Sequence, residues 1–275
     1  MTTAADRWGQ ALGAWAIPQD ILDRAPQSPW HFPPALFARA AERALGEEEA
    51  TPSRRRATEA LPNGGTVLDV GVGVGAASLP LAPPASRVIG VDPSAGMLAA
   101  FAEEAERRGV RHVEVSGTWP DVADRVDVAD VVVCHHVLYN VADLVPFAAA
   151  LTHHARIRVV VEVTARHPQT NLNPLWKALH GIDRPSSPTA HDARAVLVEM
   201  GLDVGVEELE RGLHRDHADH REMVAFTRRR LCVGPERDGE IEALLGPASA
   251  QPPRRLVTLW WHGDAPAEAT STMPS

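Results

Sequence analysis

Short runs of apolar residues, many of them β-branched, recur along the chain and are separated by polar or glycine-containing stretches. Runs of about four to eight such residues are typical of strands with a buried face. They predict strands at residues 67–70, 87–91, 110–115, 126–133, 157–163, 202–209 and 255–261. The run 157–163 is the clearest, because it contains the sequence VVVEV.

Between most of these runs, apolar residues stand three or four positions apart, which predicts helices. The helices are expected at residues 35–45, 95–108, 143–154, 191–200, 221–231 and 235–245. Ser94 is a good N-cap for the second of them, and Gly109 ends it. Strands that alternate with helices predict an α/β protein with a mostly parallel sheet.

The stretch from Thr66 to Pro93 carries the most informative chemical pattern. A strand ends at Val70, three glycines follow at alternate positions, and a second strand ends in Asp92. Glycine permits positive φ and lets a ligand approach the backbone closely. The acid stands 21 residues after the first glycine (92 − 71), near the roughly 20 expected for a carboxylate that binds ribose hydroxyls. The stretch therefore predicts a βαβ unit that binds a nucleotide-like cofactor.

The glycine spacing separates two classes of cofactor that fit this unit. Dinucleotide-binding enzymes use G-x-G-x-x-G, with the pyrophosphate at a helix N-terminus. Here the pattern is D-x-G-x-G-x-G, with Asp69 two residues before Gly71. A buried carboxylate at that position repels a pyrophosphate but suits a ligand that carries an ammonium and a sulfonium. The pattern favours S-adenosylmethionine (SAM).

At these residues the sequence resembles the class I SAM-dependent methyltransferases. Their first motif is similar to the stretch from Asp69 to Gly75, and their second is similar to Val91-Asp92-Pro93-Ser94 followed by Met97-Leu98. The resemblance implies that the first motif binds the methionine part of SAM, Asp92 the ribose and Met97 the adenine. The candidate cofactor-binding residues are Asp69, Gly71, Gly73, Gly75, Asp92, Pro93, Met97, Thr118, Trp119 and Cys134.

The resemblance also implies the fold: a doubly wound, seven-stranded, mostly parallel sheet with an antiparallel last strand and helices on both faces. We expect residues 1–60 to form a helical N-terminal cover, residues 61–263 the methyltransferase domain, and residues 264–275 a disordered tail. Tryptophans and phenylalanines gather in the first forty residues. They either shape the acceptor pocket or simply pack on the sheet. Residues 47–56, three acids followed by three arginines, are interpreted as a solvated linker.

The end of the third strand departs from the family pattern. Many members carry an acid there that contacts adenine, but this chain has Thr118, followed by Trp119. Three hypotheses stay open for this position: Thr118 and Trp119 contact the adenine, Asp121 acts instead, or Trp119 is a core residue.

Two adjacent histidines follow the fourth strand, at the edge of the sheet where the family carries its fourth motif. Histidine has an unperturbed pKa near neutrality and suits acid–base work. Adjacent side chains of an extended chain point in opposite directions, so we expect one of them to face the pocket. His136 is the favoured catalytic candidate and His135 the second. The alternative is that both are helix-cap or surface histidines.

Two further polar segments were weighed as sites. Residues 164–188 follow the fifth strand and are interpreted as an insertion on the substrate side, with Trp176, His180 and Arg184 as acceptor contacts. The segment from His214 to His220 has His and Asp three positions apart, but a polar helix entry explains it better than a metal site. No metal is assigned.

Composition limits which binding partners and which cell compartment are expected. The net charge of −9 argues against a large nucleic-acid surface. No run of 18 or more apolar residues suggests a membrane span, and the N-terminal residues do not show the basic-then-apolar pattern of a leader. Two cysteines are too few for a disulfide scaffold, so a reducing cytoplasm is expected. Nothing in the sequence indicates the oligomeric state.

These features predict an enzyme that transfers the methyl group of SAM to an O, N or C nucleophile of a small molecule by in-line displacement. Two alternatives belong to other classes. One is a SAM-binding protein without catalysis, which the missing acid at Thr118 leaves open. The other is a methyltransferase that acts on a macromolecule.

Overall fold

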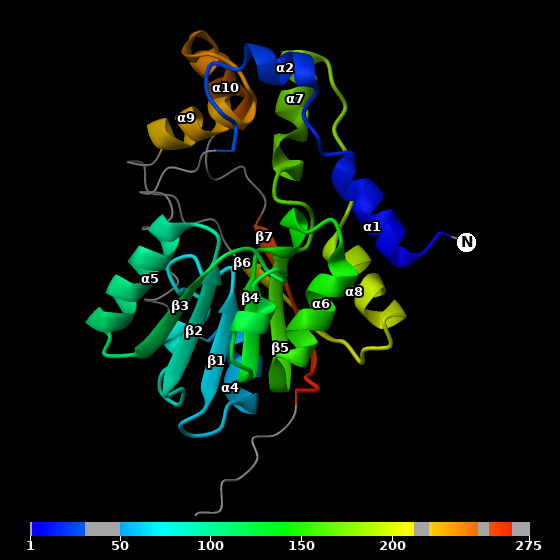
Figure 1. The fold of residues 1–275 in the computed structure, drawn as a ribbon. Helices are drawn as coiled ribbons and strands as arrows, with labels where there is room; N and C mark the ends of the chain where they lie inside the picture. Colours follow the sequence, from blue (N-terminus) through cyan, green and yellow to red (C-terminus); the bar gives the residue numbers. More distant parts are fainter. Residues whose placement is uncertain (1, 31–49, 212–219, 247–252, 266–275) are drawn as a thin grey trace, which may run out of the picture.

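The computed structural model describes residues 2–30, 50–211, 220–246 and 253–265. Figure 1 shows a central sheet with helices on both faces and a group of short helices above one edge. The strands are β1 Thr66–Val70, β2 Arg87–Asp92, β3 Arg111–Ser116, β4 Ala129–His135, β5 Ala155–Thr164, β6 Gly205–Arg211 and β7 Arg254–His262. The helices are α1 Ala4–Gly13, α2 Gln19–Arg24, α4 Pro52–Ala60, α5 Ala95–Arg107, α6 Leu144–His153, α7 Asn173–His180, α8 Ala190–Glu199, α9 His220–Arg230 and α10 Asp238–Leu245.

The strands form one sheet in the order β3-β2-β1-β4-β5-β7-β6. The strands from β3 to β5 are parallel, whereas β7 runs antiparallel between β5 and β6. The prediction of a mostly parallel, seven-stranded sheet with an antiparallel last strand is confirmed. The strand order reverses between β1 and β4, and ligands of open α/β sheets bind at the carboxyl edge beside such a reversal.

One face of the sheet is covered by α1, α6 and α8. Alternate residues of the strands, among them Leu68 of β1 and Val132 of β4, pack there with Phe147 of α6 and Leu197 of α8. Trp8 of α1 joins the same cluster and is only 1% exposed. The first helix of the chain is therefore part of the main core.

The other face is covered by α4 and α5, with the 3-10 turn at Leu79–Leu81 between them. Residues 52–56, interpreted above as linker, belong to α4 in the structure. Thr51 caps this helix, Ala57 is buried in the cluster, and the Arg56 guanidinium lies 4.3 Å from the ring centroid of Trp260. The charged pattern misled the sequence interpretation because the arginines pair with sheet residues such as Glu207.

A group of short helices, the helical cap, lies above the carboxyl edge of the sheet (Figure 1). It consists of α2, α7, α9 and α10 and has its own apolar cluster, in which Trp176 is 1% and Ile241 0% exposed. In the chain, α7 follows the end of β5 and α9 follows the end of β6, so the cap is built partly from segments that leave these two strands.

Several expectations fall partly or wholly outside the described residues. These are the helix at 35–45, most of the His214–His220 segment and residues 266–275 of the tail. The first two residues of the expected tail are ordered, since the Asp264 and Ala265 amides donate to Thr152 O and Ala155 O. None of the helices in the described ranges is long and apolar enough to cross a membrane.

Candidate cofactor and methyl-transfer site

The glycine turn after β1 lies at the carboxyl edge of the sheet, beside the reversal of strand order. The amides of Gly71 and Val72 both donate to Val91 O at the end of β2, at 2.8 and 3.0 Å. Gly71, Gly73 and Gly75 have φ angles of +77°, +53° and +82°, which side chains rarely adopt. The turn is thus fixed to the next strand by hydrogen bonds.

The three glycines are required for different reasons. A Cβ on Gly71 would lie 2.4 Å from Cγ2 of Val137, in the turn after β4, so the two turns are in contact. A Cβ on Gly75 would meet Leu79 and Phe101 at under 3 Å. A Cβ on Gly73 would meet no atom of the described residues within 4 Å, so this side of the Gly73 backbone faces open space. Gly73 is therefore the position where a ligand can approach.

Asp92 closes the second side of the glycine turn. Its Oδ2 accepts from the Gly73 amide at 3.1 Å, and its Oδ1 accepts from the Ser94 amide at 2.8 Å. Ser94 in turn caps α5, as the sequence predicted. Because each carboxylate oxygen has two lone pairs, Asp92 keeps capacity for two further donors. Its half-buried position leaves those lone pairs within reach of a diol.

Asp69 lies deeper than the glycines. It is 1% exposed, and its Oδ2 accepts from the Ser78 hydroxyl at 2.6 Å. Its Oδ1 is buried and has no hydrogen-bond partner among the residues that the structure describes. Burial raises the pKa of the Asp69 carboxyl to about 7, against the lowering effect of Ser78 and with a further rise from Asp92. The unpartnered oxygen is a place for a donor that a ligand brings.

The two histidines after β4 differ in their surroundings. His135 is half-buried, and its buried Nε2 has no hydrogen-bond partner among the described residues; burial lowers the pKa of its ring to about 4, so it is neutral at pH 7. The His136 side chain is 49% exposed, and Nε2 lies 3.3 Å from Oε1 of Glu162. His136 also has a φ of +60°, which is uncommon for a residue with a side chain. Such conformations cluster at functional sites.

The structure places the remaining candidates from β2 to β4 in different surroundings. Pro93 and Thr118 are exposed and Met97 is half-buried near the same edge. Trp119 is buried in the core instead, where its indole N–H donates to Phe147 O at 3.3 Å. Its ring is not available for stacking on an adenine, so the core hypothesis for Trp119 holds. Cys134 is fully buried in the same cluster, and burial raises the pKa of its thiol well above the usual range.

The three residues expected to contact the acceptor have partners within the helical cap and the N-terminal segment. Trp176 is buried in the cap cluster, and the ring of His180 lies 2.7 Å from Leu231 O. Arg184 donates to the carbonyls of Trp15 and Ala16, and its guanidinium lies between the rings of Trp15 and Trp176. These contacts are internal to the protein.

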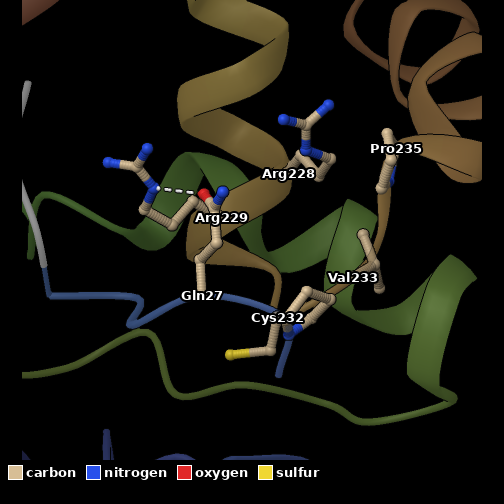
Figure 2. Close-up of a pocket in the computed structure, with 7 residues that line it drawn as sticks. Gln27, Arg228, Arg229, Cys232, Val233 and Pro235 are labelled. Atoms are coloured by element: carbon tan, nitrogen blue, oxygen red, sulfur yellow. Dashed lines mark hydrogen bonds between the residues drawn. The ribbon is translucent and has the colours of Figure 1, made fainter. Parts of the chain in front are cut away.

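Figure 2 shows a pocket in the helical cap, and none of the residues that line it belongs to the glycine turn. It is lined by Pro26, Gln27, Arg228, Arg229, Cys232, Val233 and Pro235. Its arginines already have partners, since Arg229 donates to Gln27 Oε1 at 3.1 Å and Arg228 to Asp238 at 2.7 Å. These bonds tie α9 to its neighbours, and the pocket is a packing feature of the cap.

Two polar residues of the edge escaped the sequence interpretation. Glu162 of β5 is 5% exposed and contacts His136, and Ser53 of α4 donates to its Oε2 at 2.7 Å. Burial raises the pKa of Glu162, but the hydrogen bonds and charges of the histidines, together with Ser53, outweigh it and bring the pKa to about 2. A lone glutamate within a run of buried valines was the available signal.

Comparison with known proteins identifies this arrangement. Residues 68–156, which contain the glycine turn, Asp92 and both histidines, match the model of a methyltransferase domain. This segment of the chain is similar to a methyltransferase domain. A ubiquinone biosynthesis O-methyltransferase from Azorhizobium caulinodans is 37% identical over 78 residues, which are 28% of this chain. The match spans about a third of that relative's length, 31%.

Solved structures share the fold of this chain. The YcgJ protein from Bacillus subtilis is 16% identical with a TM-score of 0.53, covering 81% of this chain and 98% of its own. A putative sarcosine dimethylglycine methyltransferase from Galdieria sulphuraria is 12% identical, also with a TM-score of 0.53, covering 95% and 99%. At these identities the similarity concerns the fold alone.

The residues at the edge fit SAM. The unpartnered Oδ1 of Asp69 suits an ammonium donor, the open space at Gly73 suits close approach of a ligand, and Asp92 retains lone pairs for two hydroxyls. When bound, SAM supplies a methyl group on a positively charged sulfur. The two carboxylates beside the turn, those of Asp69 and Asp92, complement the positive charge of SAM and its ribose hydroxyls.

Proposed function

We propose that this protein transfers the methyl group of SAM to an O, N or C nucleophile of a small molecule. One observation carries the proposal: the glycine turn, braced by Asp92 and touching the turn after β4, lies within the residues that match the methyltransferase model. The in-line reaction needs the nucleophile held about 3–3.5 Å from the methyl carbon. A rigid edge between two connected turns suits that requirement.

Within this proposal, Asp69 and the glycines bind the methionine part of SAM and Asp92 the ribose. The exposed Thr118 at the end of β3 and the half-buried Met97 flank the adenine. Trp119 and the Cys134 side chain pack in the core beneath the carboxyl edge of the sheet and hold this edge in place, since both are buried. No metal is assigned, and the described residues contain no cluster of three or more potential metal ligands.

His136 is the candidate general base for a hydroxyl acceptor, because its ring is half-exposed at the edge and contacts an ionised carboxylate. A positioned base contributes roughly 10²–10⁴-fold to rate. His135 is half-buried and neutral, and in this proposal it supports the turn. The similarity of part of this chain to an O-methyltransferase favours an oxygen acceptor.

A direct test measures SAM binding and turnover separately. The full chain is titrated with SAM by calorimetry, then incubated with methyl-labelled SAM and catechol, benzoate, benzylamine or indole. We expect SAM binding, and acceptor-dependent release of S-adenosylhomocysteine with an oxygen nucleophile. Absence of SAM binding contradicts the proposal. Binding without release from any small acceptor favours the alternatives, a SAM-binding protein or a methyltransferase acting on a macromolecule, and a labelled macromolecular product separates these two.

A further inference from the structure

Glu162 holds His136 at two points. The His136 amide donates to Glu162 O at 2.7 Å, and His136 Nε2 lies 3.3 Å from Glu162 Oε1. The positive φ of His136 turns the chain sharply at the end of β4, so that both contacts are made to one residue of β5. The same glutamate therefore fixes the backbone and the ring of His136.

The other carboxylate oxygen of Glu162 is fixed from α4. Ser53 donates to Oε2 at 2.7 Å, and the Ser53 hydroxyl lies 3.0 Å from the Thr51 hydroxyl, which also caps the helix. Because Ser53 uses its only hydroxyl proton on Glu162, the Thr51 hydroxyl donates to Ser53. Ser53 stands in the first turn of α4, where the helix dipole favours a negative charge. Glu162 is thus held as an oriented, ionised carboxylate.

An ionised carboxylate only accepts hydrogen bonds, and this decides which ring nitrogen of His136 carries the proton. Nε2 faces Glu162 and must be the N–H, so in the neutral ring Nδ1 keeps its lone pair. Among the described residues, Nδ1 of His136 has no hydrogen-bond partner. The half-exposed ring presents Nδ1 away from Glu162, at the edge that also holds the glycine turn.

We propose that Glu162 is a positioning residue that fixes the Nε2–H tautomer of His136 and thereby makes Nδ1 the atom that receives the acceptor's proton. This inference rests on the proposed function. In the reaction the acceptor O–H bond breaks and its proton passes to Nδ1. The oxygen electron pair bonds to the methyl carbon, and the electrons of the methyl–sulfur bond stay with sulfur. Glu162 then stabilises the imidazolium that results.

The test reads the tautomer directly by nitrogen NMR of the full chain labelled with ¹⁵N-histidine, with the His136 signals assigned by their loss in His136→Ala. In the wild type above pH 8 we expect the Nε2–H tautomer to dominate at His136. In Glu162→Gln the charge is lost and the carboxamide can also donate, so a large share of the Nδ1–H tautomer is expected. Unchanged thermal unfolding and SAM affinity within about twofold show that the variant is folded.

A matched control exists at the far edge of the sheet. His112 Nε2 lies 3.1 Å from Glu114 Oε1 on β3, a histidine–glutamate pair outside the site, although the Nδ1 of this ring also lies 2.9 Å from Val110 O. Glu114→Gln is expected to change the His112 signals and leave those of His136 in place. A wild-type His136 with Nδ1–H, or a tautomer indifferent to Glu162→Gln, overturns the proposal.

A kinetic measurement adds a second arm with an oxygen acceptor, using catechol if it is turned over. Glu162→Gln should lower the single-turnover rate by roughly 10- to 100-fold with little change in SAM affinity, and adding it to His136→Ala should lower the rate no further. An undiminished rate in Glu162→Gln contradicts the inference. Failure of the proposed function shows itself differently, as absent SAM binding in the wild type, while the tautomer measurement still decides the role of Glu162.

Discussion

At the scale of single residues, the two acids at the glycine turn are separated by their surroundings. Asp69 is buried, has one donor in Ser78 and leaves one oxygen unpartnered. Asp92 is half-buried, accepts two backbone amides and keeps further lone pairs. Because Asp69 is shielded from water, its carboxylate needs a cationic ligand to remain ionised at neutral pH. The free lone pairs of Asp92 suit the hydroxyls of a neutral diol.

Asp69 should make the stability of the cofactor-free protein depend on pH. Its pKa is about 7 in the folded chain against 3.8 for an ordinary aspartate, so the fold favours the protonated form. The stability that this proton contributes is complete below about pH 4 and is lost as the pH rises through about 7. At about 1.4 kcal/mol per pKa unit, the loss is on the order of a few kcal/mol.

Asp69→Asn is expected to remove that loss, so the cofactor-free variant is more stable than the wild type above pH 7 and the difference shrinks toward pH 4. Urea unfolding at about pH 5, 6.5 and 8 checks this. Stability curves that stay parallel over this range contradict the assignment. The same variant should bind SAM more weakly at pH 8, because the ammonium loses an ionised partner.

Asp92 should control cofactor affinity. Asp92→Ala removes the acceptor for the ribose hydroxyls, and we expect SAM to bind roughly 1.5–4 kcal/mol more weakly by calorimetry. Asp92→Asn is the matched comparison, because it keeps one acceptor oxygen, and it should lose less. An unchanged SAM affinity in Asp92→Ala contradicts the ribose role.

At the scale of elements, three glycines with positive φ allow the cost of backbone strain to be distinguished from the cost of a steric clash. Gly71 (+77°) would place a Cβ against Val137, Gly73 (+53°) faces open space, and Gly64 (+78°) also has nothing within 4 Å but lies before β1. Left-handed backbone costs about 1–2 kcal/mol for a residue with a side chain. All three alanine variants should lose this free energy, and they differ only in what the new Cβ would contact.

Gly73→Ala should therefore lose about the same unfolding free energy as Gly64→Ala, about 1–2 kcal/mol, while losing SAM affinity that Gly64→Ala retains. Gly71→Ala should be the least stable of the three, by roughly a further 1–3 kcal/mol, because its Cβ overlaps Val137. Urea unfolding and SAM calorimetry on the three variants measure both effects. If Gly73→Ala binds SAM as Gly64→Ala does, the ligand does not approach at this turn.

The strands and the glycine turn could be predicted from the sequence because both depend on local signals. Apolar runs set the strands, and the spacing of Asp69, the glycines and Asp92 sets the turn. Helix α4 was missed because its arginines look solvated in sequence, whereas Arg56 packs on Trp260 and pairs with Glu207. The contact between Glu162 and His136 depends on which strands are neighbours, and the sequence does not state that order locally.

At the scale of the whole molecule, the N-terminal segment packs into the core and against the cap, and does not merely cover their surface. Trp8 donates to Val141 O at 2.7 Å and stacks on Tyr139, and Trp15 donates to Ser187 O at 2.6 Å. Of the two hypotheses for the N-terminal aromatics, the structure favours packing for Trp8 and Trp15. Trp30, by contrast, is 56% exposed.

Trp8→Ala should cost about 3–5 kcal/mol of unfolding free energy, a large part of the stability of an ordinary domain. Trp30→Ala is the control and should stay within about 0.5 kcal/mol of the wild type. Removal of residues 1–30 should accordingly impair cofactor and acceptor binding together. A truncated chain that unfolds like the wild type and loses only acceptor binding would show that this segment acts as a lid.

The contact between Gly71 and Val137 links two neighbouring parts of the edge mechanically. Val137 directly follows His136, so a displacement of the glycine turn is expected to move Val137 and, with it, the imidazole of His136. Within the proposed function, this steric contact aligns the methyl donor with the base. Changes to the size of residue 137 should alter the alignment of the donor with the imidazole before they alter the affinity for either reactant.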